Sequence, residues 1–372
     1  MKPHSTYFKN LDSLRAFAAL AVILAHAALW IPAPVADWVP VVKDILSFDN
    51  MGGTYGVDFF FILSGFLITY RLLQEKQATQ SIHLWHFYGR RILRIWPLYF
   101  ISLLIGFVLY PLFLLSLGQP PVENASPALY ATFLANFDHL WNGEPATGIL
   151  GVQWSVAVEE QFYLCWPLLF LGRIRPVFML VLMGALVIGS ECFFLANVPG
   201  PRSYYHSLSC LRFLATGGMI GLFSFYYPGQ IQLLFSKIPK WASALIAIAG
   251  IAMLGFASGL SKAFPPAKYV IHGLPFALFS FIILEQCFSP HAWIEFGRSK
   301  VLRYLGKISY GLYLLHMVAV YIVLETPFLN QPDLFLLNIL LVILLTVGLS
   351  ALSFRYVEKP FLRWKLRFSK MD

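Results

Sequence analysis

The sequence has few charged residues for its length. Only 12% of its 372 residues are charged, whereas about 25% is usual for a soluble domain. Hydrophobic residues make up 58%, and the mean hydropathy is +0.69. A water-soluble fold of this length could not bury that much apolar surface, which excludes soluble globular and disordered chains. The composition predicts an all-α polytopic membrane protein with the lipid bilayer around most of it.

Cysteines and acidic residues are also scarce. The four cysteines fall in apolar stretches and form no Cys-x-x-Cys pair, so we expect no metal site and interpret them as small apolar side chains. The 18 acidic residues leave a net charge of +9. The basic residues lie at the ends of apolar segments, which is typical of membrane topology and argues against nucleic-acid binding. No linker, internal repeat or low-complexity stretch interrupts the chain, which predicts one domain over residues 1–372.

Ten apolar segments have nearly the length that crosses a bilayer, about 20 residues. They are 11–30, 57–72, 95–117, 152–171, 176–196, 208–227, 241–260, 272–288, 308–328 and 335–356. Turn-forming pairs such as Gly52-Gly53 and Pro120-Pro121 separate them. We therefore predict about ten transmembrane helices.

The distribution of Lys and Arg predicts the orientation. If the N-terminus is inside, only Lys43, Arg202, Lys262 and Lys268 fall on the outer side. Both termini are therefore predicted to be cytoplasmic, in a multi-pass protein of the cytoplasmic (inner) membrane. The outer segment 118–151 lacks Lys and Arg. Its apolar stretch 129–140 is too short to cross, which predicts a re-entrant or interfacial helix.

Ionisable side chains inside apolar segments are costly and mark candidate functional sites. Arg15 and His26 share the first segment, and their spacing of eleven residues puts both on one helical face, about 16 Å apart along the axis. Such a helix could hold a phosphate-bearing donor at Arg15 and provide acid–base chemistry at His26. A snorkelling arginine and a hydrogen-bonded core histidine explain the pair equally well.

Glu159 and Glu160 are adjacent in another apolar segment. Neighbours on a helix point about 100° apart, so at least one carboxylate must face a polar cavity or a partner. A carboxylate beside His26 could orient its imidazole or share its proton. The alternative is a salt bridge to Arg15 or Arg212 that holds helices together.

Three arginines cluster at the cytoplasmic start of a predicted helix. Arg90, Arg91 and Arg94 lie at i, i+3 and i+4 spacings, so they would form one face suited to phosphate groups. Ordinary anchoring of the inner helix end explains the cluster about as well.

Two further segments place polar groups in lipid. Tyr310 and Tyr313 precede His316, which predicts either a cavity lining or a structural histidine bonded to tyrosine. Asp58 and Ser64 occupy another such segment and are candidates for substrate or donor contact, although Asp58 could simply cap a helix. The adjacent Gly65 indicates close helix packing.

Taken in order, these motifs resemble the acyltransferase-3 family of membrane proteins. The resemblance rests on Leu11–Arg15 with His26, Gly56–Ile68, Arg90–Pro97, Trp154–Tyr163, Ile308–His316 and Glu358–Phe361. Together these blocks extend over nearly the whole chain, from residue 11 to 361.

The resemblance implies a ten-helix domain that takes an acyl group, usually acetyl, from coenzyme A and passes it to a hydroxyl of a glycan or other small acceptor. Acyl-coenzyme A is then a co-substrate, and no permanently bound cofactor is expected. The family's Arg-x10-His pair corresponds to Arg15 and His26, its basic motif to Arg91 and Arg94, and its acidic motif to Glu159 and Glu160. Trp154 and Tyr163 flank the acidic motif and are candidates for substrate contact. Because the chain ends soon after the last segment, we expect a stand-alone member without an appended esterase domain.

The mechanism we expect begins with coenzyme A phosphates on Arg90, Arg91 and Arg94, near Arg15. His26, oriented by Glu159 or Glu160, then removes the proton of the acceptor hydroxyl as its oxygen attacks the thioester. A proton-coupled permease is the rival interpretation, because intramembrane carboxylates and histidines also serve transport. A non-catalytic scaffold is the third.

Overall fold

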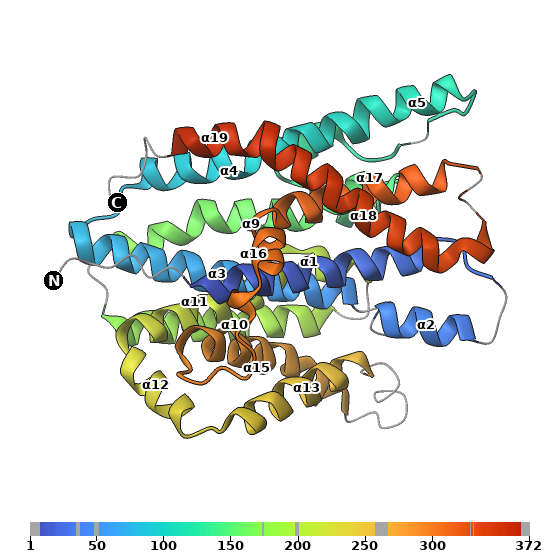
Figure 1. The fold of residues 1–372 in the computed structure, drawn as a ribbon. Coiled ribbons are helices and arrows are strands. Elements are labelled where there is room, and N and C mark those ends of the chain that lie inside the picture. Colours follow the sequence, from blue (N-terminus) through green and yellow to red (C-terminus); the bar gives the residue numbers. More distant parts are fainter. Residues whose placement is uncertain are drawn as a thin grey trace.

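A computed structural model describes residues 8–34, 38–47, 52–121, 123–172, 175–197, 201–256, 267–327, 329 and 331–365. Within these residues all regular secondary structure is helical, which confirms the all-α prediction (Figure 1). Most helices run along one common direction, and α16 (Lys300–Lys307) crosses it. The prediction of a single domain extends beyond the described residues at both ends and stays a prediction.

The long helices follow the predicted apolar segments. They are α1 (Lys9–Trp30), α3 (Gly52–Thr79), α4 (Leu84–Leu104), α9 (Gln153–Cys165), α10 (Pro176–Asn197), α11 (Ser207–Tyr226), α13 (Lys240–Gly255), α15 (Ala267–Phe288), α17 (Ser309–Leu324) and α18 (Phe335–Ser353). Shorter helices join or extend them: α2 (Trp38–Ser47), α5 (Tyr110–Ser116), α6 (Pro127–Ala131), α7 (Ala135–Asn142), α8 (Gly148–Gly151), α12 (Pro228–Ser236) and α19 (Lys359–Lys365). Two π-helical turns, Ile105–Leu109 and Phe354–Glu358, continue α4 into α5 and α18 into α19.

Six of the described helices are long and apolar enough to cross a membrane, and the number rises to eight if two bent helix pairs are counted as spans. The bent pairs are α12 with α13, at 98°, and α16 with α17, at 75°. The predicted span 152–171 becomes the 13-residue α9 and a 3-10 turn at Trp166–Phe170. Within α15, His272–Phe288 forms an apolar helix. Residues 257–260 and 328, predicted to end two spans, lie outside the described residues, and the count of ten stays a prediction.

Helices α3 and α11 approach each other closely because glycines line their contact. A Cβ atom on Gly65 would lie 2.0 Å from the carbonyl oxygen of Leu214, and one on Gly217 would lie 2.0 Å from that of Ile62. Side chains at these positions would force the two backbones apart. The prediction that Gly65 serves helix packing is therefore confirmed.

The segment predicted to lie outside is described at residues 118–121 and 123–151, where it forms the short helices α6, α7 and α8 instead of one interfacial helix. Phe133, with φ +57°, separates α6 from α7, which breaks the predicted apolar helix 129–140. The segment packs onto the helical domain through Asn136, which donates to the carbonyl of Tyr205 and accepts from Gln161. It therefore forms a cap against α9 and the start of α11.

Candidate active site

A large cavity opens among α1, α3, α4, α9, α16, α17 and α19. Its volume is about 1070 Å³, and it extends along α3 from Thr79 to Val57. These two residues are about 33 Å apart at the usual helical rise. Six cationic side chains line the cavity against three carboxylates: Arg15, Arg71, Arg90, Arg91, Arg94 and Lys307 against Asp12, Glu75 and Glu159. The surplus of positive charge suits a polyanionic ligand.

The predicted arginine cluster lines this cavity, and each arginine is held differently. Arg90 is paired with Glu75 at 3.0 Å, which ties α4 to α3. The guanidinium of Arg91 lies over the ring of Tyr163, 5.0 Å from its centroid. Arg15 contacts Asp12 at 3.3 Å, from one helical turn away.

Arg94 has an acidic neighbour that sequence reasoning left out of the site. Glu358 lies in the π-helical turn after α18, is 5% exposed, and interacts electrostatically with Arg94. The family motif at Glu358–Phe361 was the available signal, but its spacing to Arg94 in sequence is too long to suggest contact.

The adjacent carboxylates of α9 diverge as their spacing predicts. Glu159 lines the cavity and accepts a hydrogen bond from Ser64 at 2.6 Å, and the Tyr163 hydroxyl donates to Ser64 at 3.1 Å. Glu160 is outside the lining and accepts from the indole N–H of Trp96 at 3.0 Å.

One predicted contact is wrong. We expected Glu159 or Glu160 to orient His26, but the structure directs the two carboxylates to Ser64 and Trp96. The reason is the position of Glu159 along the helix axes. Glu159 interacts electrostatically with Arg15, which lies eleven residues before His26 on α1. The alternative salt bridges are not formed either, because Arg15 contacts Asp12, and Arg212 contacts Glu191 at 3.1 Å.

His26 lies beyond the end of the cavity that Val57 and Tyr313 line. A Cβ on Gly53 would be 3.4 Å from its ring. Val57, the lining residue on α3 nearest to Gly53, is four positions further along the helix, which is a rise of about 6 Å. The His26 and His316 rings have centroids 5.0 Å apart, and Tyr313, which lines the cavity, is 6.0 Å from His316. The two histidines therefore continue the line that the cavity begins.

The tyrosines of α17 anchor the cavity wall. The Tyr310 hydroxyl donates to the carbonyl of Ile95 at 2.8 Å. The Tyr313 hydroxyl shares a hydrogen bond of 2.5 Å with Ser155. His316 is bonded to the backbone carbonyl of Tyr313, not to a tyrosine hydroxyl. The prediction that a tyrosine side chain bonds this histidine is therefore wrong, since the partner is a backbone carbonyl.

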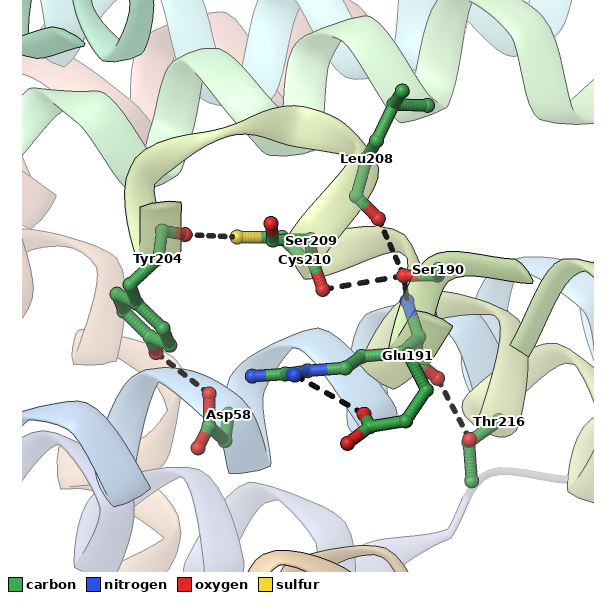
Figure 2. A network of polar contacts seen from close by, with 9 residues as sticks. Asp58, Ser190, Glu191, Tyr204, Leu208, Ser209, Cys210 and Thr216 are labelled. Atoms are coloured by element: carbon green, nitrogen blue, oxygen red, sulfur yellow. Dashed lines mark hydrogen bonds and ion pairs between the residues drawn. The ribbon is translucent and has the colours of Figure 1, made fainter. Parts of the chain in front are cut away.

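Two other predicted contacts, Asp58 and Trp154, lie outside the cavity. Asp58 is buried and accepts from Tyr204 at 2.6 Å, in a network that also contains Cys210 (Figure 2). It lies in the second turn of α3, so it does not cap that helix. Six positions separate it from Ser64, which turns the two side chains to different faces of α3. Trp154 packs against the rings of Tyr204 and Tyr205.

One carboxylate that interacts with His26 was missed in the sequence. Glu144, in the outer segment, interacts electrostatically with His26 and accepts from Tyr205 at 2.6 Å. Burial and the bond to Glu144 raise the pKa of Tyr205, so its hydroxyl stays protonated and donates. The only sequence signal was a carboxylate in a segment free of Lys and Arg.

Comparison with known proteins adds independent information. Residues 8–355 match the family described as "Acyltransferase domain". The chain is 29% identical over 376 residues to the peptidoglycan O-acetyltransferase OatA of Listeria monocytogenes, covering 95% of this chain and 56% of the relative. It is 28% identical to the O-acetyltransferase OatA of Staphylococcus aureus (strain NCTC 8325 / PS 47), covering 95% and 57%. It is also 28% identical to the putative peptidoglycan O-acetyltransferase YrhL of Bacillus subtilis, covering 96% and 55%.

The chain thus spans a little over half the length of these curated relatives. No solved structure gave a significant match.

Proposed function

We propose, since this chain belongs to the acyltransferase domain family, that it is a membrane O-acyltransferase. In this proposal it moves an acyl group, acetyl by default, from coenzyme A to a hydroxyl of a glycan. One relative named above is called a peptidoglycan O-acetyltransferase and another an O-acetyltransferase. Peptidoglycan is therefore the first acceptor to test.

The observation that carries the proposal is the basic cavity that points toward His26. Acyl-coenzyme A is an elongated molecule with phosphates at one end and a thioester at the other. The cavity has the matching polarity: arginines at one end, and Val57, Phe60 and Tyr313 at the end nearest the histidines. Its volume of about 1070 Å³ is at the upper limit of ordinary ligand pockets, about 1,000 Å³.

The arginines bind the donor's phosphates in this proposal. Arg91 and Arg94 of α4 and Arg15 of α1 all line the cavity, and Arg15 interacts electrostatically with the other two. Guanidinium forms bidentate, charge-assisted hydrogen bonds with phosphate oxygens. Arg90, already paired with Glu75, positions the start of α4 and contributes charge.

His26 acts as the general base. Its Nδ1 lies 2.9 Å from the carbonyl oxygen of Val22. A carbonyl can only accept, so Nδ1 carries the proton and Nε2 has the free lone pair. That nitrogen takes the proton of the acceptor hydroxyl while the hydroxyl oxygen attacks the thioester carbon. The carbon–sulfur bond breaks, and the thiolate receives the proton from His26.

The remaining predicted residues have supporting roles or none in this scheme. Ser64 and Tyr163 hold Glu159 at the cavity wall, and Tyr310 and Tyr313 fix α17 beside it. Glu160, Asp58 and Trp154 do not line the cavity, so we assign them no donor contact. We place the protein in the inner membrane with both termini cytoplasmic, so the donor enters from the cytoplasm.

The test is acetyl transfer by the purified protein in proteoliposomes. Acetyl-coenzyme A labelled in its acetyl group is supplied with peptidoglycan glycan strands, and label on the glycan is measured. Label should appear with the wild type and be lost in His26→Ala, with His291→Gln, an exposed histidine, as the control. Absence of transfer by the wild type, with solute flux instead, would favour the permease. Full transfer by His26→Ala would remove His26 from the mechanism.

A further inference from the structure

The two histidines beyond the cavity form a pair. His26 is the proposed general base, and the proposed function assigns no role to His316. His26 belongs to α1 and His316 to α17, helices that pack against each other. Their ring centroids are 5.0 Å apart and the rings are tilted by 54°. Their separation in sequence gave no indication of this contact.

The hydrogen bond of His316 fixes which nitrogen is free. Its Nδ1 is 2.6 Å from the carbonyl oxygen of Tyr313, three residues earlier on the same helix. A carbonyl oxygen only accepts, so Nδ1 donates and Nε2 has an unshared lone pair. His316 is 0% exposed, and Nε2 has no hydrogen-bond partner among the described residues. A buried acceptor without a partner is a destabilising feature that calls for an explanation.

The Nδ1 atom of His26 is hydrogen-bonded in the same way, which gives the pair its chemical character. Both rings donate from Nδ1 to a carbonyl of their own helix, so both expose a basic Nε2. The resting pair therefore has two acceptors and no proton to share. One added proton would satisfy both nitrogens, and the proposed reaction delivers one proton to this place.

We propose that His316 is a positioning residue for His26, accepting a hydrogen bond from the proton that His26 gains during acyl transfer. This inference rests on the proposed function. The acceptor O–H bond breaks and its proton goes to Nε2 of His26 as the new carbon–oxygen bond forms. The Nε2–H of His26 then donates to Nε2 of His316, which holds the proton away from the new ester. When the carbon–sulfur bond breaks, His26 gives the proton to the thiolate, and His316 ends unchanged.

A structural role for His316 predicts a different pattern of effects. If the ring only filled space, an apolar ring in its place would leave turnover unchanged. If it held the donor, its loss would raise KM for acetyl-coenzyme A. The orphaned Nε2 also means that replacement by phenylalanine should cost little stability, since it removes an unsatisfied polar atom.

The experiment compares His316→Phe and His316→Gln with the wild type, in the same assay with labelled acetyl-coenzyme A and peptidoglycan glycan strands. We expect His316→Phe to keep its melting temperature and its KM for acetyl-coenzyme A while kcat falls about tenfold to a hundredfold, the effect of losing one hydrogen bond to a charged group. His316→Gln, whose amide oxygen can accept, should recover part of kcat. The control is His291→Gln, which lies in an exposed turn and should match the wild type.

Each contrary result has a definite meaning. A kcat for His316→Phe within about twofold of wild type, or a change in KM alone, overturns this inference while the proposed function stands. If glutamine does not recover more than phenylalanine, the acceptor role is likewise overturned. Failure of the wild type to transfer acetyl, or full activity of His26→Ala, instead refutes the proposed function itself. If His316→Phe does not fold, His316→Gln is compared with His316→Leu instead. The glutamine variant must then retain the higher kcat, because its amide can accept the hydrogen bond and leucine cannot.

Discussion

The hydroxyl of Ser64 donates to the carboxylate of Glu159 at 2.6 Å and so joins α3 to α9 at the wall of the basic cavity. The two residues are 95 positions apart in the sequence. Their contact explains how a carboxylate is kept in an apolar helix, because a buried charge needs a hydrogen-bond partner. It also lends itself to a direct test.

Replacing Ser64 by alanine should destabilise the protein only while residue 159 can accept its hydrogen bond. We expect Ser64→Ala to lower stability by about 1–3 kcal/mol, the cost of an unsatisfied buried group, and to do much less in a Glu159→Leu background, where residue 159 has no acceptor. Thermal unfolding of the four variants in detergent measures the coupling. Ser116→Ala, at an exposed helix end, is the control. Equal losses in both backgrounds would contradict the contact.

Removing the charge of Arg91 should weaken donor binding more than turnover. Arg91→Gln should raise KM for acetyl-coenzyme A about tenfold or more, since a hydrogen bond to a charged group contributes about 1.5–3 kcal/mol. Arg91→Lys should recover only part of this, because lysine lacks the planar fork. Steady-state kinetics with varied donor measure it. Arg298→Gln removes an arginine whose side chain is 79% exposed and should not change KM; an unchanged KM for Arg91→Gln would mean that phosphates bind elsewhere.

A methyl group at Gly65 should disrupt the helix pair that supports the cavity. The added Cβ would lie 2.0 Å from the carbonyl oxygen of Leu214, and over-packing of this kind costs about 1–3 kcal/mol or more. Gly65→Ala should therefore lower the melting temperature or prevent folding. In Gly184→Ala the new methyl has nothing within 4 Å, and alanine favours a helix, so stability should be kept. Similar melting temperatures for the two variants would argue against the close α3–α11 contact.

Mild acid should loosen the outer segment through His139. This residue is 1% exposed, and burial lowers its pKa to about 4, against about 6.5 when unfolded. Between these two pKa values the unfolded chain binds more protons than the folded protein. The contribution of His139 to the free energy of unfolding is therefore fully present above about pH 6.5 and is lost as the pH falls toward 4. The full effect is about 3 kcal/mol, from about 1.4 kcal/mol for each pKa unit.

Melting temperatures of the wild type and His139→Phe across this pH range measure that effect. The variant cannot take up the proton, so its melting temperature should fall less steeply as the pH drops. His291 is exposed in the folded protein, so the melting temperature of His291→Gln should change with pH as that of the wild type does. Parallel slopes for His139→Phe and the wild type would show that His139 does not control the acid response.

Much of the site follows from local spacing. Arg90, Arg91 and Arg94 reach one cavity because i, i+3 and i+4 positions share a helical face. Arg15 joins them, and only one of the adjacent Glu159 and Glu160 lines the cavity, as the 100° step requires. Asp58 shows the limit of such reasoning: its segment belongs to the site, yet its own side chain turns to Tyr204.

The sequence by itself determined that lipid surrounds this protein, where its helices lie and which side chains had to avoid lipid. The length of an apolar segment and its helical periodicity are local properties. The tertiary structure alone decided which residues lie near enough to interact: Ser64 with Glu159, Glu358 with Arg94, Glu144 and His316 with His26. These interactions depend on the packing and relative level of segments far apart in the chain, which no spacing within one helix encodes.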